Sequence, residues 1–163
     1  MSNPTETRRL VASDTDLASQ TIRTLKWEVE STHVVSLDSA GLKLWLENPA
    51  NVLIAAITED GIGVGFALGY LLDRIDRSQP MLCFYEIVVA PNHRRTGIGR
   101  QLVEAMKIVA QQSKALKMWI QTDPDNVAAR TLYQRAGGIE SATPDHVYSW
   151  LEGTFDNQGP SSP

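Results

Sequence analysis

Apolar residues in the first third of the chain recur with a helical period. They predict a helix near residues 14–27, preceded by a short extended segment at residues 7–10. A second helix is expected over residues 38–47, where apolar residues share one face and Asn48-Pro49 would end it. The chain therefore begins with a pair of helices, before any pattern that is typical of a sheet.

Strand patterns follow in the middle of the chain. A continuous apolar run at residues 52–57 ends in a polar turn that contains glycine. Residues 65–72 are expected to pair with this run as a hairpin, although their glycines lower strand propensity. After a polar loop at residues 73–80, residues 82–89 are the strongest predicted strand, apolar on both faces except at Glu86.

Helices and short strands alternate in the last part of the chain. The spacing of apolar residues predicts a helix over residues 97–113, a strand over 117–121, a helix over 126–136 and a last strand over 147–151. Strands linked by hairpins in one place and by helices in another are typical of an α/β (α+β) domain. The sequence therefore predicts a mixed central sheet.

The length of 163 residues predicts a single domain. We assign it to residues 1–152, because residues 153–163 are rich in Gly, Pro, Ser and Asn and are expected to be a disordered tail. Hydrophobic residues make up 42% of the chain, which is enough for a sizeable core.

Charge and cysteine content narrow the function classes. The net charge of −4 disfavours nucleic acid as a partner, since binding to phosphates relies on excess Lys and Arg. No apolar stretch is long enough for a membrane span, so no membrane association is expected. The single cysteine, Cys83, cannot form an internal disulfide, which fits a cytoplasmic protein. The three histidines have no ligand spacing, so no metal site is expected.

A basic, glycine-containing turn follows the strongest predicted strand. It begins a predicted helix, and unpaired backbone N–H groups at a helix N-terminus attract anions. Three arginines, Arg94, Arg95 and Arg100, add positive charge to an otherwise acidic chain. The alternative interpretation is a surface turn with solvated arginines.

Two motifs in this order resemble the GNAT superfamily of acyl-CoA-dependent N-acetyltransferases. The first is Arg-x-x-Gly-x-Gly at residues 94–99, after the buried strand. The second is Asn-x-x-Ala-x-x-Leu-Tyr at residues 126–133, on a helix that ends at Gly137. The resemblance implies the GNAT fold, a mixed sheet with a splay between two central strands, flanked by about four helices.

The same resemblance implies that acetyl-CoA is the co-substrate and that no metal is used. In the family, the first motif binds the coenzyme A pyrophosphate, while the preceding strand offers its backbone to the pantetheine arm. The residues expected to bind the coenzyme are Ile87, Val88, Val89, Arg94, Arg95, Thr96, Gly97, Ile98, Gly99, Arg100, Asn126, Ala129 and Tyr133.

Two residues are expected to be catalytic. By resemblance, Tyr133 donates a proton to the leaving thiolate, a role that a phenol with a pKa of about 10 can fill. Core packing is the alternative role for this tyrosine. A lone carboxylate in an apolar strand is costly to bury unless it is paired or reached by water. By resemblance to the family, Glu86 takes the proton from the attacking ammonium, directly or through water. A structural ion pair or a solvent-facing edge position is its alternative.

The acceptor is expected to be a small, polycationic amine. Residues 136–163 contain no Lys or Arg, and acidic residues are expected to attract the acceptor: Glu86, Asp123, Asp145 and Glu152. An acidic, solvated surface is the alternative. The two motifs and the sequence between them look most like the aminoglycoside 3-N-acetyltransferases, which implies antibiotic resistance. Glu86 departs from that group, which tends to carry Asp there.

Two other functions stay open on these residues. One is acetylation of a protein N-terminus, a lysine or a polyamine, which would use the same two motifs with a different acceptor surface. The other is an acyl-CoA-binding regulatory module without catalysis, which the presence of both Glu86 and Tyr133 disfavours. By resemblance to the family, a homodimer is expected. Trp45 is interpreted as a core or interface residue.

Overall fold

The computed structural model describes residues 5–29 and 38–141. This part of the chain forms one sheet in the order β1-β2-β3-β4-β5. The strands are β1 (Thr5–Arg9), β2 (Asn51–Thr58), β3 (Gly63–Leu72), β4 (Met81–Val89) and β5 (Met118–Trp119). The helices are α1 (Thr15–Val29), α2 (Ser39–Glu47), α3 (Ile98–Gln112) and α4 (Val127–Arg135), with short 3-10 turns at Ala12–Asp14 and Pro91–His93.

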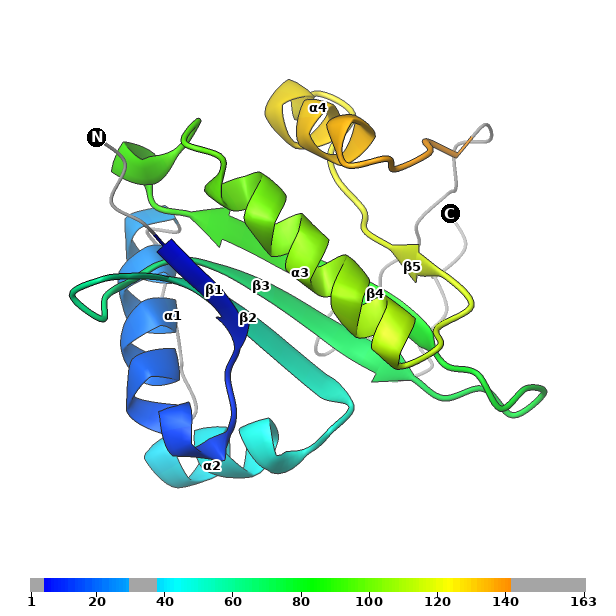
Figure 1. Ribbon diagram of the computed structural model, residues 1–163, viewed down its shortest axis with the longest axis horizontal. Helices are drawn as coiled ribbons and strands as arrows, with labels where there is room; N and C mark the ends of the chain where they lie inside the picture. Colours follow the sequence, from blue (N-terminus) through cyan, green and yellow to red (C-terminus); the bar gives the residue numbers. More distant parts are fainter. Residues whose placement is uncertain (1–4, 30–37, 142–163) are drawn as a thin grey trace, which may run out of the picture.

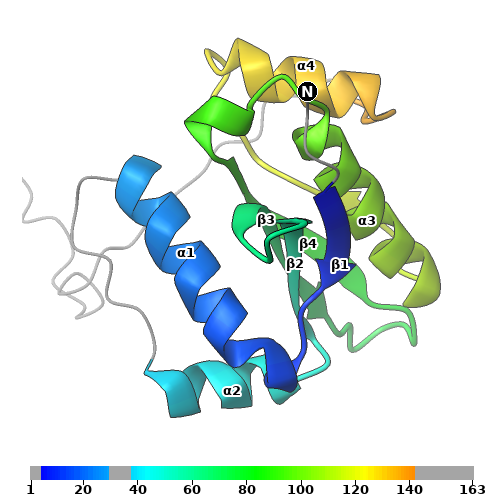
Figure 2. The same cartoon turned by 60° about the vertical axis from the view of Figure 1, so that its left-hand side comes forward.

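The sheet lies between two layers of helix. Helix α3 runs along one face, while α1 and α2 cover the other (Figures 1 and 2). Neighbouring strands are antiparallel from β1 to β4, and β5 is parallel to β4, so the sheet is mixed as predicted. The GNAT-like architecture expected from the sequence, a mixed sheet with four flanking helices, is confirmed in the described part of the chain.

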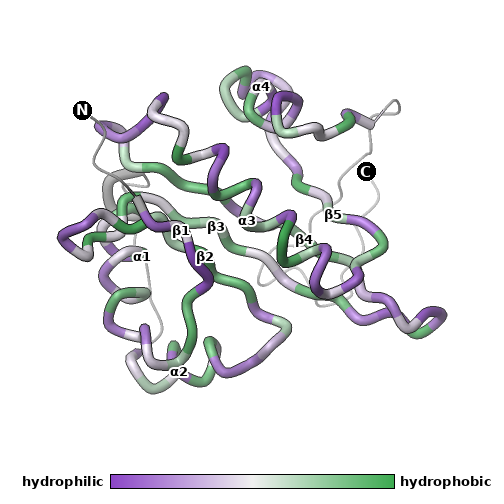
Figure 3. Tube along the Cα trace, in the orientation of Figure 1, coloured by the Kyte–Doolittle hydropathy of each residue, from purple (hydrophilic) through white to green (hydrophobic). Residues whose placement is uncertain are grey.

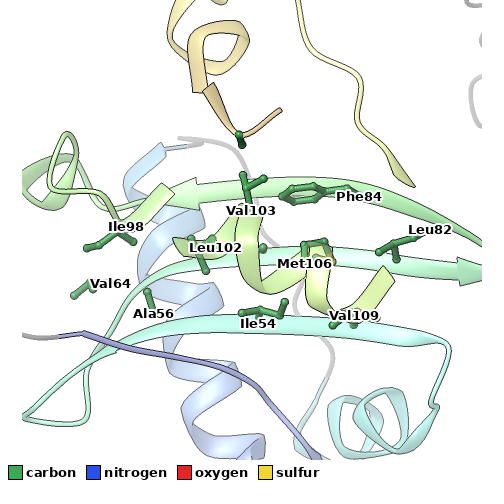
Figure 4. Packing of buried hydrophobic residues seen from close by; sticks show 13 residues of the cluster. Ile54, Ala56, Val64, Leu82, Phe84, Ile98, Leu102, Val103, Met106 and Val109 are labelled. Carbon is green, nitrogen blue, oxygen red and sulfur yellow. The ribbon is translucent and has the colours of Figure 1, made fainter. Parts of the chain in front are cut away.

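Each face of the sheet has its own apolar core. On the α3 side, Ile98, Leu102 and Met106 of the helix pack against Ile54, Phe84 and other strand residues (Figure 4). On the other side, residues of α1 and α2 cover a second cluster. The chain is apolar along the central strands and hydrophilic in the loop between β3 and β4 (Figure 3). Strand β2 reads as a continuous apolar run because helices cover it from both sides.

The contact between β4 and β5 is short. It consists of two register pairs, Leu82 with Met118 and Cys83 with Trp119. Among the described residues, no pairing joins the two strands beyond Cys83, and the chain diverges from β4 as it leads to α4 (Figure 1). The splay implied by the resemblance therefore lies between β4 and β5. In residues 5–29 and 38–141, the half of β4 that follows Cys83 pairs with β3 alone and has no strand neighbour on the β5 side, and we call it the unpaired half.

A β-bulge interrupts β4 at the beginning of this unpaired half. Leu68 of β3 pairs with Glu86, whereas the next residue, Gly69, pairs with Phe84, so Tyr85 is the extra residue. Phe84 and Ile87 both contact the core on the α3 side, although residues three apart in a regular strand face opposite ways. The bulge therefore turns Tyr85 and Glu86 together toward the face of α1 and α2.

The predicted helices and strands are confirmed with small shifts at their ends. The main difference is β5, which has two residues instead of the five expected at residues 117–121. The strand is short because the chain diverges from β4 after the pair of Cys83 with Trp119, although β4 itself continues to Val89. The strand predicted at residues 147–151 and the tail at residues 153–163 lie outside the described residues.

None of the helices in residues 5–29 and 38–141 is long and apolar enough to cross a membrane.

Helix α1 approaches β3 closely at Gly63. A Cβ atom at this position would overlap the buried side chain of Thr21 on α1. We expect Gly63→Ala to lower the free energy of unfolding by about 1–3 kcal/mol, the usual range for overpacking. The double variant Gly63→Ala/Thr21→Ala should recover part of this loss, because the methyl and hydroxyl groups in the way are gone. Urea unfolding measures both, and equal losses in the two variants would contradict the close approach.

Candidate functional site

The backbone of the loop between β4 and α3 has a positive φ at two positions. Arg95 has φ 62° and Gly97 has φ 95°, both in the left-handed region that favours glycine. Two side chains fix the loop. Arg94 Nε donates to the Val89 carbonyl oxygen at 3.1 Å, and the Thr96 hydroxyl donates to the His93 carbonyl oxygen at 2.6 Å.

The N-terminus of α3 presents backbone donors. Gly97 is the N-cap and has no side chain to bond them, and the first helical bond runs from the Gln101 amide to the Gly97 carbonyl at 3.1 Å. A Cβ on Gly97 would meet nothing within 4 Å, so the space beside the helix end is open. The buried Ile98 side chain anchors this end to the core. The arrangement suits an anion, which the helix dipole also favours.

Exposed arginines surround this helix end. Arg94, Arg95 and Arg100 are all exposed, and they come from the two sides of the Gly97 turn. An anion at the amides would therefore have guanidinium groups within reach of its other oxygens. The side chain of Arg94 is engaged through Nε, and its two terminal nitrogens point from a fixed position on the loop.

Gly99 lies at the contact between α3 and α4. A Cβ here would lie 3.2 Å from Leu132 Cδ2, so the glycine lets α4 pack against the first turn of α3. Lys107 adds a second link between these helices. Its Nζ donates to the Ala136 carbonyl oxygen at 3.1 Å, at the C-terminus of α4, and forms an ion pair with Glu104 at 2.9 Å. These contacts hold α4 beside the start of α3.

Three predicted site residues lie in the first turn of α4 or just before it: Asp123, Asn126 and Ala129. The Asn126 side chain accepts a hydrogen bond from the Ala129 amide at 3.1 Å and so caps the helix. Asp123 is exposed, and its carboxylate accepts from the Asp125 amide at 2.8 Å in the preceding turn. The side-chain contacts of Asn126 and Asp123 thus fold the start of α4. The other two predicted acceptor residues, Asp145 and Glu152, lie outside the described part.

Tyr133 lies on the face of α4 that meets the sheet. It is half-buried against the core on the α3 side, and its ring packs edge-to-face with Phe84 at a centroid distance of 6.5 Å. Burial raises the pKa of the Tyr133 phenol above its ordinary value near 10. The hydroxyl is therefore protonated throughout the neutral pH range and can act as a proton donor.

Glu86 lies across β4 from Tyr133. Its register partner Leu68 belongs to the core under α1 and α2, so the Glu86 side chain projects from that face. The carboxylate is not solvent-facing as a whole, since Oε2 is buried. Glu86 and Tyr133 thus flank the unpaired half of β4 from opposite sides. Ile87, Val88 and Val89 follow directly, along the stretch of β4 that β5 does not reach and that no other described strand pairs with on this side.

The structure brings together residues that are far apart in the sequence. The basic loop, the start of α3, Tyr133 on α4 and Glu86 on β4 all lie around the unpaired half of β4. Within residues 5–29 and 38–141, no three His, Cys, Asp or Glu side chains are grouped so that they could hold a metal ion.

The bulge that orients Glu86 was not predicted from the sequence. Trp45 packs against the core under α1 and α2, as predicted, and also contacts Tyr70 beside the bulge. A tyrosine next to the lone carboxylate, Tyr85-Glu86, was the pattern that could have drawn attention to this place.

Comparison with known proteins gives the family. The model of the acetyltransferase (GNAT) family matches residues 20–138. The uncharacterized N-acetyltransferase YhfO of Bacillus subtilis is 33% identical over 98 residues, which cover 60% of this chain and 65% of that protein. The ribosomal protein bS18-alanine N-acetyltransferase of Escherichia coli is 25% identical over 100 residues, covering 61% of this chain and 64% of that protein. GCN5-related N-acetyltransferase 7, chloroplastic, of Arabidopsis thaliana is matched over 26% of its length, at 32% identity. The chain thus spans less than two thirds of each of these relatives.

Solved structures share the fold at low sequence identity. The aminoglycoside acetyltransferase meta-AAC0020 from an uncultured soil metagenomic sample, in complex with sisomicin, superimposes with a TM-score of 0.81 at 22% identity. The alignment covers 91% of this chain and 97% of that one. AAC(6')-Iy in complex with a CoA–acetylneamine bisubstrate analog has a TM-score of 0.72 at 19% identity, over 91% of this chain and 99% of that one. Because the family model matches most of this chain, the chain belongs to the acetyltransferase (GNAT) family.

Proposed function

We propose that this protein is an acetyl-CoA-dependent N-acetyltransferase that acts directly on a primary amine. One observation carries the proposal: Tyr133 and Glu86 flank the unpaired half of β4, next to an anion-binding helix N-terminus. Family membership supports it, since the curated relatives are named N-acetyltransferases.

The residues of the loop fit the coenzyme. The open space beside Gly97 and the backbone donors of α3 suit a pyrophosphate, with the arginines of the loop as further partners. Ile87, Val88 and Val89 pair with β3 on one side, and on the β5 side none of the described residues pairs with them. That edge suits an extended arm with amide groups, which would continue the sheet. When bound, acetyl-CoA would supply the acetyl group as a reactive thioester.

The two candidate catalytic side chains divide the proton transfers between the faces of β4. Glu86 accepts the proton of the substrate ammonium, because only the neutral amine is nucleophilic. Tyr133 holds its proton at Oη, where burial keeps the phenol neutral, and on the other face it would donate this proton to the departing sulfur of coenzyme A as the acetyl group passes to the amine nitrogen. Asn126 and Ala129 act indirectly by starting the helix that carries Tyr133.

The specific acceptor that we propose is the 3-amino group of an aminoglycoside antibiotic, so that the protein would confer resistance. The fold it shares with aminoglycoside acetyltransferases supports this choice, as does the acidic character of residues 136–163. The weak sequence similarity of this chain to the ribosomal protein alanine N-acetyltransferase favours a second candidate acceptor, the N-terminus of a protein. We further propose a cytoplasmic homodimer, in keeping with the family and with the single cysteine.

Release of free CoA thiol from acetyl-CoA tests the acceptor. We expect release with gentamicin and kanamycin, and none with spermidine or with peptides that carry a free N-terminal amine or lysines. Release with a peptide alone would replace the aminoglycoside by a protein acceptor. If none of these acceptors gave release of free CoA thiol while acetyl-CoA still bound in calorimetry, a non-catalytic binding module would be favoured.

The Tyr133→Phe variant tests the proton donor. Loss of the hydroxyl should lower kcat on the order of 100-fold at saturating acetyl-CoA, with little change in the affinity for acetyl-CoA. Because burial raises the pKa of Tyr133 above 10, the midpoint of any fall in wild-type kcat through loss of this proton should lie above pH 10. Gln134→Ala, an exposed neighbour on the same helix, is the control. Unchanged turnover of Tyr133→Phe would remove the hydroxyl from the mechanism.

A pair of glycine variants tests the anion site. Gly97 and Gly61 both have positive φ and open space at the Cβ position, but only Gly97 begins α3. Alanine at either position should cost about 1–2 kcal/mol of stability through backbone strain. Only Gly97→Ala should also raise the Kd for coenzyme A, by about tenfold, in isothermal titration calorimetry. Equal affinities in both variants would show that Gly97 serves folding alone.

A further inference from the structure

Three aromatic side chains form a row on the face of the sheet that carries Glu86. Trp45 of α2 packs against Tyr70 of β3 at a centroid distance of 6.1 Å and an interplanar angle of 87°. Tyr70 packs against Tyr85 of β4 at 5.8 Å and 78°. Both contacts are edge-to-face, the geometry that aromatic pairs prefer. We call these three side chains the aromatic row.

The outer end of the row is open to solvent. Tyr85 is 63% exposed, whereas Trp45 and Tyr70 are half-buried. An exposed tyrosine usually moves among rotamers, but here the ring rests against Tyr70, which rests in turn on Trp45. The aromatic row therefore offers a supported ring at the surface of the sheet.

The bulge sets this ring next to the candidate general base. Tyr85 is the extra residue of β4, and Glu86 follows it on the same face, opposite Leu68. A regular strand would have directed the two side chains to opposite faces. The face that holds the carboxylate thus also holds an accessible aromatic ring.

A carboxylate and an aromatic ring side by side favour an acceptor with more than one positive charge. The ring face attracts an ammonium group through its quadrupole, and this attraction is stronger when both are partly desolvated. A monoamine has a single charge, which the reaction removes at Glu86. A polyamine carries a second ammonium group that can stay protonated on the ring.

We propose that the aromatic row is part of the acceptor-binding surface, with the Tyr85 ring binding a second ammonium group of a polycationic amine while the reacting amine lies at Glu86. This inference rests on the proposed function. Tyr85 is the specificity-determining residue, and Tyr70 and Trp45 hold its ring in position.

Kinetics with two amino sugars test the proposal. Kanamycin carries several amino groups and glucosamine carries one. Tyr85→Leu keeps an apolar side chain but removes the ring, and it should raise the KM for kanamycin by about tenfold. The KM values for glucosamine and acetyl-CoA should stay within about twofold. Tyr85→Phe keeps the ring face and should retain the wild-type KM for kanamycin.

The control is Ile75→Ala, which removes a fully exposed apolar side chain from the loop between β3 and β4. It should leave all three KM values unchanged. An unchanged KM for kanamycin in Tyr85→Leu would overturn the inference, and so would an equal rise for glucosamine, which would mean that the ring recognises the sugar and not its charge.

A failure of the proposed function would look different. In that case wild-type protein would transfer acetyl groups to neither sugar, and calorimetry of kanamycin binding would replace kinetics. Weaker binding by Tyr85→Leu than by Tyr85→Phe would then still support the aromatic row as a cation site. Equal binding by the two variants would overturn it.

Discussion

The bulge at Tyr85 is the constraint on which the site depends. Without it, β4 would alternate strictly, and the residues on either side of the bulge could not both contact the core under α3. Phe84 and Ile87 do so because one extra residue corrects their spacing. The same extra residue gives Tyr85 and Glu86 a common direction. A single register shift thus lets Phe84 and Ile87 pack in the core on one face and places Tyr85 and Glu86 together on the other face.

The opposite side of the site depends on helix packing. Helix α4 carries Tyr133, and Gly99 and Lys107 of α3 hold α4 in place through contacts with Leu132 and Ala136. Since α3 also presents its N-terminal amides beside Gly97, one helix supports both the proposed anion site and the proposed proton donor. Movement of α3 would therefore disturb both sites together.

Most of the helices and strands could be predicted from the spacing of apolar residues along the sequence. Strand β2 could be predicted because burial on both faces gives a continuous apolar run. Helix α3 could be predicted because burial of one face gives apolar residues at helical spacing. The two family motifs located the loop and Tyr133. The resemblance also gave Gly99 a role in binding the coenzyme, whereas in the structure its missing side chain leaves room for Leu132. No motif distinguishes these two reasons for a glycine.

The features that the sequence did not predict depend on pairing between strands. A bulge is a property of two strands in register, so the apolar run around Tyr85 could not reveal it. The length of β5 likewise depends on where the chain diverges from β4, after the pair of Cys83 with Trp119. The aromatic row joins Trp45, Tyr70 and Tyr85 from three different elements, and only the folded chain brings them together.

The central claim is that the bulge presents Glu86 to the amine as a proton acceptor. The most direct test is the pH dependence of kcat/KM for Glu86→Gln against wild-type protein, with Glu59→Gln, an exposed glutamate in a turn, as the control. The account predicts a large loss at pH 7 that shrinks as the pH rises toward the pKa of the amine, because solvent then supplies the neutral nucleophile. A loss of the same size at every pH would contradict it.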